Sequence, residues 1–327
     1  MNSDCLNRFV GYFILVAVCF LLPSISAGAD SAKIELHTFE TMTLTDKQFL
    51  TGAKGGKSVV LSGELRLPST RNDRVPAVVI VHGSGGIMGN EDHWAREFND
   101  MGIAAFLFDS FTGRGIRTTG ADQSQLGLLA AVYDAFRALD LLAKDDRIDR
   151  ARIGIMGGSR GARVVMGTSM KRFQRMYGTT EAEFAAYLAF YTPCETRYIG
   201  DLDIVEKPIR LFHGQADDYT PVGPCRSYVN QLRNNGKDVE LKEYSGAYHL
   251  FDNPVVPLRH VDNAQTGRRC SFEERPAGEI INTQTGRPFT FDDPCVERGV
   301  TVGYDPRAHG EAVKDVKSLL VRVFKIQ

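Results

Sequence analysis

Residues 152–161 read RIGIMGGSRG, and this stretch decides the fold. Residues 152–156 have the pattern of a buried strand, and a helical pattern begins at Arg160. The G-x-S-x-G motif at 157–161 therefore lies between a strand and a helix, where its small residues allow a sharp turn. That turn exposes the Ser159 hydroxyl at the carboxyl edge of a sheet, next to the positive end of a helix. Ser159 is thus a candidate nucleophile, the alternative being a plain glycine-rich turn.

Strand-like and helix-like patterns alternate on both sides of this stretch. The runs AVVIVH, AAFLFD and IRLFHG are continuously apolar and end in turn residues, which suits parallel strands buried on both faces. The predicted strands are residues 33–44, 58–67, 77–82, 104–109, 152–156, 185–191, 208–213 and 239–244. The predicted helices are residues 124–144, 160–176, 221–234 and 308–323.

This alternation predicts the α/β class, with a mostly parallel, doubly wound sheet of about eight strands and helices on both faces. The first two strands are expected to form an antiparallel hairpin at an edge. The turn between them, residues 52–58, resembles a phosphate-binding loop. It lacks the first glycine, because Thr51 occupies that place, and it precedes a strand instead of a helix.

Two further strand ends carry the residues that a serine nucleophile needs. Asp217 follows the strand at 208–213, and His249 follows the strand at 239–244. The order Ser, acid, His predicts that Asp217 orients His249, which takes the Ser159 proton and later returns it. Asp218 is the rival acid. The rival bases are His82, His93, His213 and His260.

An oxyanion hole is expected from two backbone N–H groups near Ser159. One is that of Arg160, immediately after the candidate nucleophile. The other comes from the loop after residues 77–82, at Gly83 or Ser84, where the glycines allow the backbone to approach a substrate closely. The glycine spacing of this loop does not fit a dinucleotide-binding fingerprint.

Composition narrows the possible partners. The chain has 327 residues, 43% of them hydrophobic, which is enough for a sizeable core. The formal net charge is -1, so no basic excess is available to bind nucleic acid. Cysteine and histidine spacings typical of a zinc site do not occur in the sequence, and no metal is expected.

The first 29 residues are typical of a secretory signal peptide. A basic residue, Arg8, precedes an apolar run at 9–22 and an A-x-A pattern that ends at Ala29. The run is shorter than the ~20 residues that a spanning helix needs, so a membrane anchor is the less favoured alternative. We therefore expect an exported protein, periplasmic or secreted, whose mature chain is residues 30–327.

Four cysteines remain after the signal peptide, and an even number in an exported protein favours disulfides. Three pairings are possible. Cys194 and Cys225 lie beyond the ends of neighbouring predicted strands, so we expect them to pair and to leave Cys270 with Cys295. The second pair lies in residues 253–306, a loop-rich stretch with little periodicity. We interpret it as an ordered insertion near the site within a single domain.

The phrases GGSRG, HGQADDYTP, YSGAYHLFD and DSFTGRG together resemble the dienelactone hydrolase family. The resemblance spans roughly residues 58–249 and the last helix. It implies an α/β-hydrolase fold, no cofactor, and hydrolysis of esters or lactones. The family proper carries a cysteine nucleophile and is compact and cytosolic. Ser159, the signal peptide and the insertion therefore favour a general serine esterase over the family's own lactone substrate.

The family also holds a substrate carboxylate with an arginine after the fourth strand, near the position of Arg114. Arg160 is unusual because a cation at a helix N-terminus opposes the helix dipole. One of these two side chains is hypothesised to favour an acidic substrate. The alternative is that both are solvated surface arginines.

The sequence thus predicts a serine hydrolase that cleaves a small-molecule carboxylic ester or lactone through an acyl-enzyme on Ser159. A peptidase or acyltransferase with the same triad is an alternative. A non-catalytic scaffold acting as an envelope binding protein is another. No stable membrane anchor and no nucleic-acid partner are expected, and the oligomeric state is left open.

Overall fold

The computed structural model describes residues 33–69, 74–178 and 182–326. The predicted signal peptide, with Cys5 and Cys19, lies outside these residues. Among the helices of the described part, none is long and apolar enough to cross a membrane.

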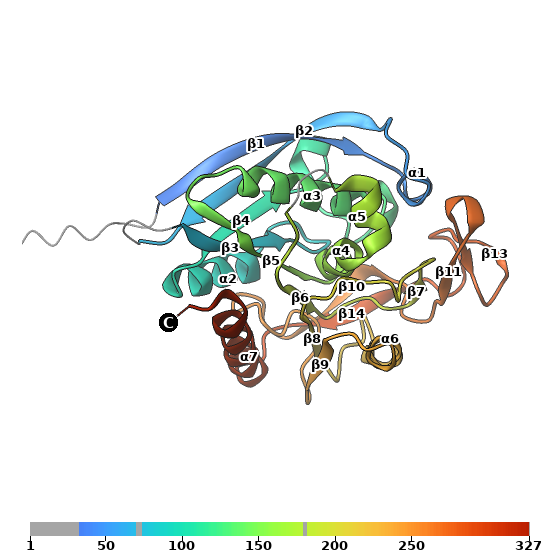
Figure 1. The fold of residues 1–327 in the computed structure, drawn as a ribbon. Helices are drawn as coiled ribbons and strands as arrows, with labels where there is room; N and C mark the ends of the chain where they lie inside the picture. The colour runs from blue at the N-terminus through green and yellow to red at the C-terminus, as the bar shows by residue number, and fades with distance from the viewer. Residues whose placement is uncertain (1–32, 70–73, 179–181, 327) are drawn as a thin grey trace, which may run out of the picture. The chain divides into compact units, whose positions relative to one another are not determined.

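One eight-stranded sheet forms the centre of the fold (Figure 1), and it contains every strand that the sequence predicted. Its strands, in spatial order, are β1 (Lys33–Thr43), β2 (Lys57–Leu67), β4 (Ala104–Asp109), β3 (Val75–Val81), β5 (Ile148–Gly158), β6 (Tyr187–Phe190), β8 (Ile209–Gly214) and β9 (Val239–Tyr244). The pairs β1–β2 and β2–β4 are antiparallel, and all other pairs are parallel. The predicted edge hairpin and mostly parallel sheet are therefore confirmed.

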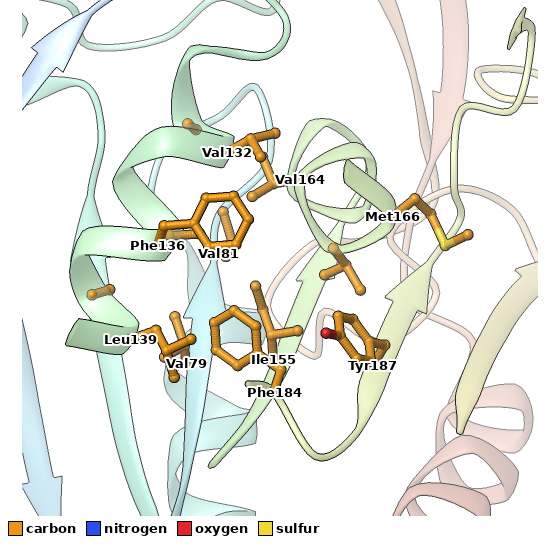
Figure 2. Close-up of a cluster of buried hydrophobic side chains, with 14 of the residues drawn as sticks. Val79, Val81, Val132, Phe136, Leu139, Ile155, Val164, Met166, Phe184 and Tyr187 are labelled. Carbon is orange, nitrogen blue, oxygen red and sulfur yellow. The ribbon is translucent and has the colours of Figure 1, made fainter. Parts of the chain in front are cut away.

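Helices cover both faces of the sheet because its central strands are apolar on both sides. One face packs against α3 (Ala130–Ala143), α4 (Arg160–Ser169), α5 (Lys171–Tyr177) and α6 (Val222–Asn234), and the other against α2 (Gly89–Asp100) and α7 (Pro306–Phe324). In β3, Val79 and Val81 face the first layer, whereas Val78 and Ile80 face the second. Figure 2 shows Val79 and Val81 beside side chains of α3 and α4.

Two predicted helices differ from the structure in their bounds. The helix expected at 160–176 is divided at Met170, whose backbone is extended and forms a bridge to Ile204. The hydroxyls of Thr168 and Ser169 donate to carbonyls three residues earlier and so help to end α4. The helix expected at 124–144 begins at Ala130, after a 3-10 turn at Gln123–Gln125. The short α1 (Asp46–Leu50) and α2 were not predicted.

Residues 253–306 are folded, and they build two small sheets next to the central one. The first pairs β10 (Arg259–Thr266) with β14 (Glu297–Val302). The second has the order β13 (Arg287–Pro288), β12 (Glu279–Asn282), β11 (Phe272–Arg275) and β7 (Thr196–Arg197). Disulfides join Cys194 to Cys225 and Cys270 to Cys295.

Candidate active site

Ser159 occupies a strained turn between β5 and α4. Its φ of 56° and ψ of -118° lie in a region that L-residues seldom adopt, so the surrounding packing must hold it there. Gly158 and Gly161 are required near Ser159 because neighbouring atoms leave no room for a side chain at these two positions. A Cβ at Gly158 would lie 2.5 Å from Tyr191 Oη, and one at Gly161 would collide with the Val81 carbonyl. Ser159 N donates to Phe190 O at 2.9 Å, which ties the turn to β6.

Asp217 and His249, which follow β8 and β9, meet at the same edge of the sheet. His249 Nδ1 lies 2.8 Å from Asp217 Oδ2, and the other carboxylate oxygen accepts from the N–H groups of Tyr219 and Thr220 at 2.9 Å each. Burial on its own raises the pKa of the Asp217 carboxyl. The neighbouring imidazoles and the Thr220 N–H outweigh that effect, so the pKa lies below its ordinary value. Asp217 is thus an ionised carboxylate in hydrogen-bond contact with His249.

The His249 ring is held between two aromatic rings. Its centroid lies 4.4 Å from that of Tyr191 and 4.6 Å from that of Tyr219. Tyr191 also packs against Gly158, so it connects the imidazole with the Ser159 turn. Within the described residues, the Ser159 hydroxyl makes no hydrogen bond with His249. Such bonds are often long in unliganded enzymes and shorten when substrate binds.

The rival residues have other partners. Asp218 accepts from the N–H and the hydroxyl of Thr301, at 2.7 and 3.0 Å, and so anchors β14. His82 accepts from Ser110 N. His213 Nε2 lies 2.6 Å from Thr220 O and 3.5 Å from Asp217 Oδ2, farther from that carboxylate than His249 Nδ1. His260 is exposed beside Asp262, and His93 contacts Glu97 and His309 of α7, so within the described residues neither of these histidines is paired with Asp217.

The backbone expected to form an oxyanion hole lies next to Ser159. A methyl group on Gly83 would be 3.5 Å from Ser159 Cβ and 3.2 Å from Gly158 O. The Arg160 N–H belongs to the first turn of α4, where helix N–H groups have no partner within the helix. Ser84 lines the same pocket as Ser159.

Arg114 does not lie at this pocket, which corrects its prediction as a substrate-binding residue. Its guanidinium makes two hydrogen bonds to Asp134, at 2.8 and 2.9 Å, and donates further to Thr43 Oγ1 and to the carbonyls of Ser110 and Met42. Both side chains of the pair are buried. A buried carboxylate requires such a cation, so Arg114 is a structural residue.

Arg160 does line the pocket, but it is buried and not the solvated surface residue of the alternative interpretation. Its guanidinium donates to Gln123 Oε1 and to the carbonyls of Leu126 and Gly127. Within the described residues it forms no ion pair. Burial lowers its pKa to about 10.

The catalytic pocket, as we name the hollow in front of Ser159, measures about 80 Å³. The body of the protein supplies twelve of the lining residues, among them Arg160, Arg163, Glu195 and Tyr219. Residues 253–306 supply the other eight, which are Gln265, Thr266, Gly267, Arg268, Phe272, Phe289, Phe291 and Val296. The insertion is therefore part of the pocket, a question that the sequence left open.

A buried polar network behind the Ser159 turn was missed in the sequence analysis. Asp252 accepts from Trp94 Nε1 at 2.8 Å and from Tyr191 Oη at 3.0 Å, while Asn90 contacts both Tyr191 and Glu91. Burial raises the pKa of Glu91 to about 7 and also raises that of Asp252. In the sequence, this network could have been suspected only from Asp252, which follows His249 by three residues.

A strained serine between a strand and a helix, with an Asp–His pair at later strand ends of a mostly parallel sheet, defines an α/β-hydrolase. The chain belongs to the dienelactone hydrolase family, whose sequence model matches residues 62–271. It is thus a hydrolase of a family that acts on small molecules. No curated protein matches the chain.

Solved structures show the same fold. One is P91, a dienelactone hydrolase-like promiscuous phosphotriesterase from metagenomic libraries, with a TM-score of 0.53 and 15% identity over 88% of this chain and 98% of that one. Another is esterase 2 of Thermogutta terrifontis phosphorylated by paraoxon, with a TM-score of 0.55 and 15% identity over 88% of this chain and 95% of that one.

Proposed function

We propose that the protein is a serine hydrolase that cleaves a carboxylic ester or lactone with the triad Ser159, Asp217 and His249. The observation that carries this proposal is the 2.8 Å hydrogen bond between His249 Nδ1 and Asp217 Oδ2, with Tyr191 packed against both His249 and the strained Ser159 turn. That bond fixes the tautomer of His249 and leaves Nε2 free to act as a base.

In the proposed reaction, His249 Nε2 removes the Ser159 proton while Oγ attacks the carbonyl carbon of the substrate. The oxyanion of the tetrahedral intermediate accepts from the Arg160 N–H and from that of Gly83 or Ser84. The C–O bond then breaks, and His249 gives its proton to the leaving alcohol. Water, activated in the same way by His249, attacks the acyl-enzyme and releases the acid.

A peptidase and a non-catalytic binding scaffold are the competing functions. The labelling below tests the binding scaffold, and hydrolysis of p-nitrophenyl esters compared with p-nitroanilide peptides tests the peptidase. The buried, ionised Asp217 supports catalysis, because a binding scaffold has no need of a charged group held against a histidine.

The test is labelling of the purified protein with a fluorophosphonate probe. Esterase 2 of T. terrifontis, which shares the fold, is phosphorylated by paraoxon, and this guides the choice of a phosphorus electrophile. We expect the wild type to react, Ser159→Ala not to react, and Ser84→Ala to react still, because Ser84 is the other serine of the pocket. Absence of labelling in folded wild type would favour the binding scaffold.

We also propose that the protein is exported, with residues 30–327 as one mature domain that carries the insertion. Its two disulfides support this, because such bonds persist in oxidising compartments. N-terminal sequencing of protein recovered from the expressing cell's envelope or medium tests it. A mature protein that begins at Met1 would contradict it.

A further inference from the structure

A second hollow of about 280 Å³ adjoins the catalytic pocket. The two share four apolar residues, Leu128, Phe272, Phe289 and Phe291, which therefore stand between them. Beyond these four, the second hollow extends to Leu129, Tyr198, Ile280 and Pro288, and its lining also includes Gly278 and the polar residues Asp46, Lys47, Thr196 and Glu279. We name it the acyl chamber, for the reason given below, and define its apolar part by Leu128, Leu129, Phe272, Ile280, Phe289 and Phe291.

The acyl chamber has an aromatic wall that the insertion supplies. The ring centroids of Phe272 and Phe289 lie 4.3 Å apart, and those of Phe289 and Phe291 lie 5.0 Å apart. Leu128, Phe289 and Phe291 are only half-buried, so their faces toward the hollow still contact solvent. An apolar group that entered the chamber would remove this surface from water, which is favourable.

The position of His249 identifies which part of an ester this chamber would receive. His249 must protonate the leaving alcohol, so the alcohol lies on the His249 side of Ser159. That side is built by Tyr191, Tyr219 and Val302, and none of these three lines the acyl chamber.

The chamber lies instead on the Arg160 side of the pocket. Arg160 donates to the carbonyls of Leu126 and Gly127, directly before Leu128, which lines both hollows. An acyl group bound to Ser159 and pointing away from His249 would therefore run past Leu128 and the phenylalanines.

We propose that the acyl chamber binds an apolar acyl arm of the substrate, which makes the preferred substrate an ester of a medium-chain or aryl-alkanoic acid. This inference rests on the proposed function. With a volume of about 280 Å³, the hollow has room for a medium-chain acyl group. The half-buried phenylalanines at its entrance then serve as specificity-determining residues for the acyl part.

The test compares p-nitrophenyl acetate, butyrate, hexanoate and octanoate. Each methylene that leaves water contributes up to about fourfold to kcat/KM, so we expect at least a roughly tenfold rise from acetate to octanoate in wild type. Ile280→Trp fills the chamber and should bring the octanoate-to-acetate ratio close to one. Should that variant not fold, Ile280→Ala enlarges the chamber and should move the best chain length upward.

Ile281→Trp is the matched control. Ile281 is the next residue of β12, so its side chain points to the opposite face of that small sheet and lines neither hollow. Its octanoate-to-acetate ratio should equal that of wild type. A series of acetate esters of longer alcohols should respond equally in wild type and in Ile280→Trp.

The outcomes separate the two proposals. If wild type hydrolyses acetate but shows no dependence on acyl length, the acyl chamber is overturned while the serine hydrolase stands. If Ile280→Trp changes the dependence on the alcohol and not on the acyl group, the assignment to the acyl arm is overturned. If wild type neither reacts with the fluorophosphonate nor hydrolyses any ester, both proposals fail together.

Discussion

The loops after β5, β8 and β9 and the insertion at 253–306 contribute to one site, but different forces hold them in place. The loops are continuations of buried parallel strands, and their geometry follows from the sheet. The insertion is closed on itself by the Cys270–Cys295 disulfide, and it is attached to the body by the pairing of β11 with β7 and by individual polar contacts such as those of Thr301 with Asp218 and of Glu274 with Arg172. The comparison indicates that the proposed chemistry belongs to the sheet and the selection of substrate to the insertion.

Two adjacent carboxylates divide these tasks between them. Asp217 faces His249, whereas Asp218 holds β14 through Thr301. Asp217, the proposed catalytic carboxylate, and Asp218, which anchors β14 of the insertion, are thus consecutive residues. This pair gives the strongest test of the comparison.

The largest effect is expected for Asp217→Asn. An amide cannot stabilise the imidazolium that forms on His249 and favours the wrong tautomer, so kcat should fall by a factor on the order of 10³–10⁴. Steady-state kinetics with a short ester measures it. Asp218→Asn is the matched change and should alter kcat by less than about tenfold, because it only weakens the bond to Thr301. Equal losses in both variants would contradict the division.

Arg114→Met should have the next largest effect, on stability and not on chemistry. It leaves the Asp134 carboxylate buried without its cation, which costs about 3–5 kcal/mol in the free energy of unfolding. Urea unfolding measures the change. Arg147→Ala is the control, because the ion pairs of Arg147 with Glu35 and Asp145 are partly exposed and contribute at most about 1 kcal/mol. If Arg114→Met were as stable as wild type but no longer hydrolysed esters, Arg114 would have a role in the active site after all.

The central sheet could be predicted because its strands are buried on both faces. Runs such as β3 and β4 are continuously apolar, and no other arrangement suits them as well. By contrast, α2 begins with the polar residues Asn90 and Glu91, which the fold buries, so its pattern was not recognised. In the insertion, the buried residues of β10 gather at one end of the strand without alternation and β13 has only two residues, so neither strand shows a period that could be recognised in the sequence.

The site could be predicted only where a local rule applies. Asp217 and His249 lie together as expected, because both follow the carboxyl ends of parallel strands at one edge of the sheet. The catalytic roles of Ser159, Asp217 and His249 stay proposals. Contacts between distant parts of the chain have no such rule, which explains the missed bond from Trp94 to Asp252, 158 residues apart. Arg114 was misjudged for the same reason, since Asp134 on α3 gave no signal in the sequence.

The buried network behind the Ser159 turn predicts a pH-dependent stability. Folding raises the pKa of Glu91 from about 4.5 to about 7, so the folded chain holds a proton that the unfolded chain has released. The free energy of unfolding should therefore fall as pH rises through this window, by up to about 3 kcal/mol, and then level off. Glu91→Gln, which cannot ionise, should lose the part of this slope that Glu91 causes and keep the part due to Asp252, whose pKa is also raised. Thermal unfolding of both proteins between pH 4.5 and 8 would show it, and parallel curves would exclude Glu91 as the cause.

The smallest effect is expected for removal of the Cys270–Cys295 disulfide, and it addresses the insertion alone. The bond closes the segment that carries Phe272, Phe289 and Phe291, so Cys270→Ser with Cys295→Ser should loosen the aromatic wall of the acyl chamber. KM for the octanoate ester should rise about three- to tenfold, a loss of up to ~1.4 kcal/mol, while kcat/KM for the acetate ester stays within about twofold.

The other disulfide provides the contrast. Cys194 and Cys225 join the loop after β6 to α6, next to the catalytic pocket itself. Their double serine variant should therefore affect acetate and octanoate esters alike. If removal of Cys270–Cys295 also lowered both esters equally, the insertion would support the geometry of Ser159 and His249 and not only the acyl arm. The separation of chemistry from substrate selection between the two regions would then be wrong.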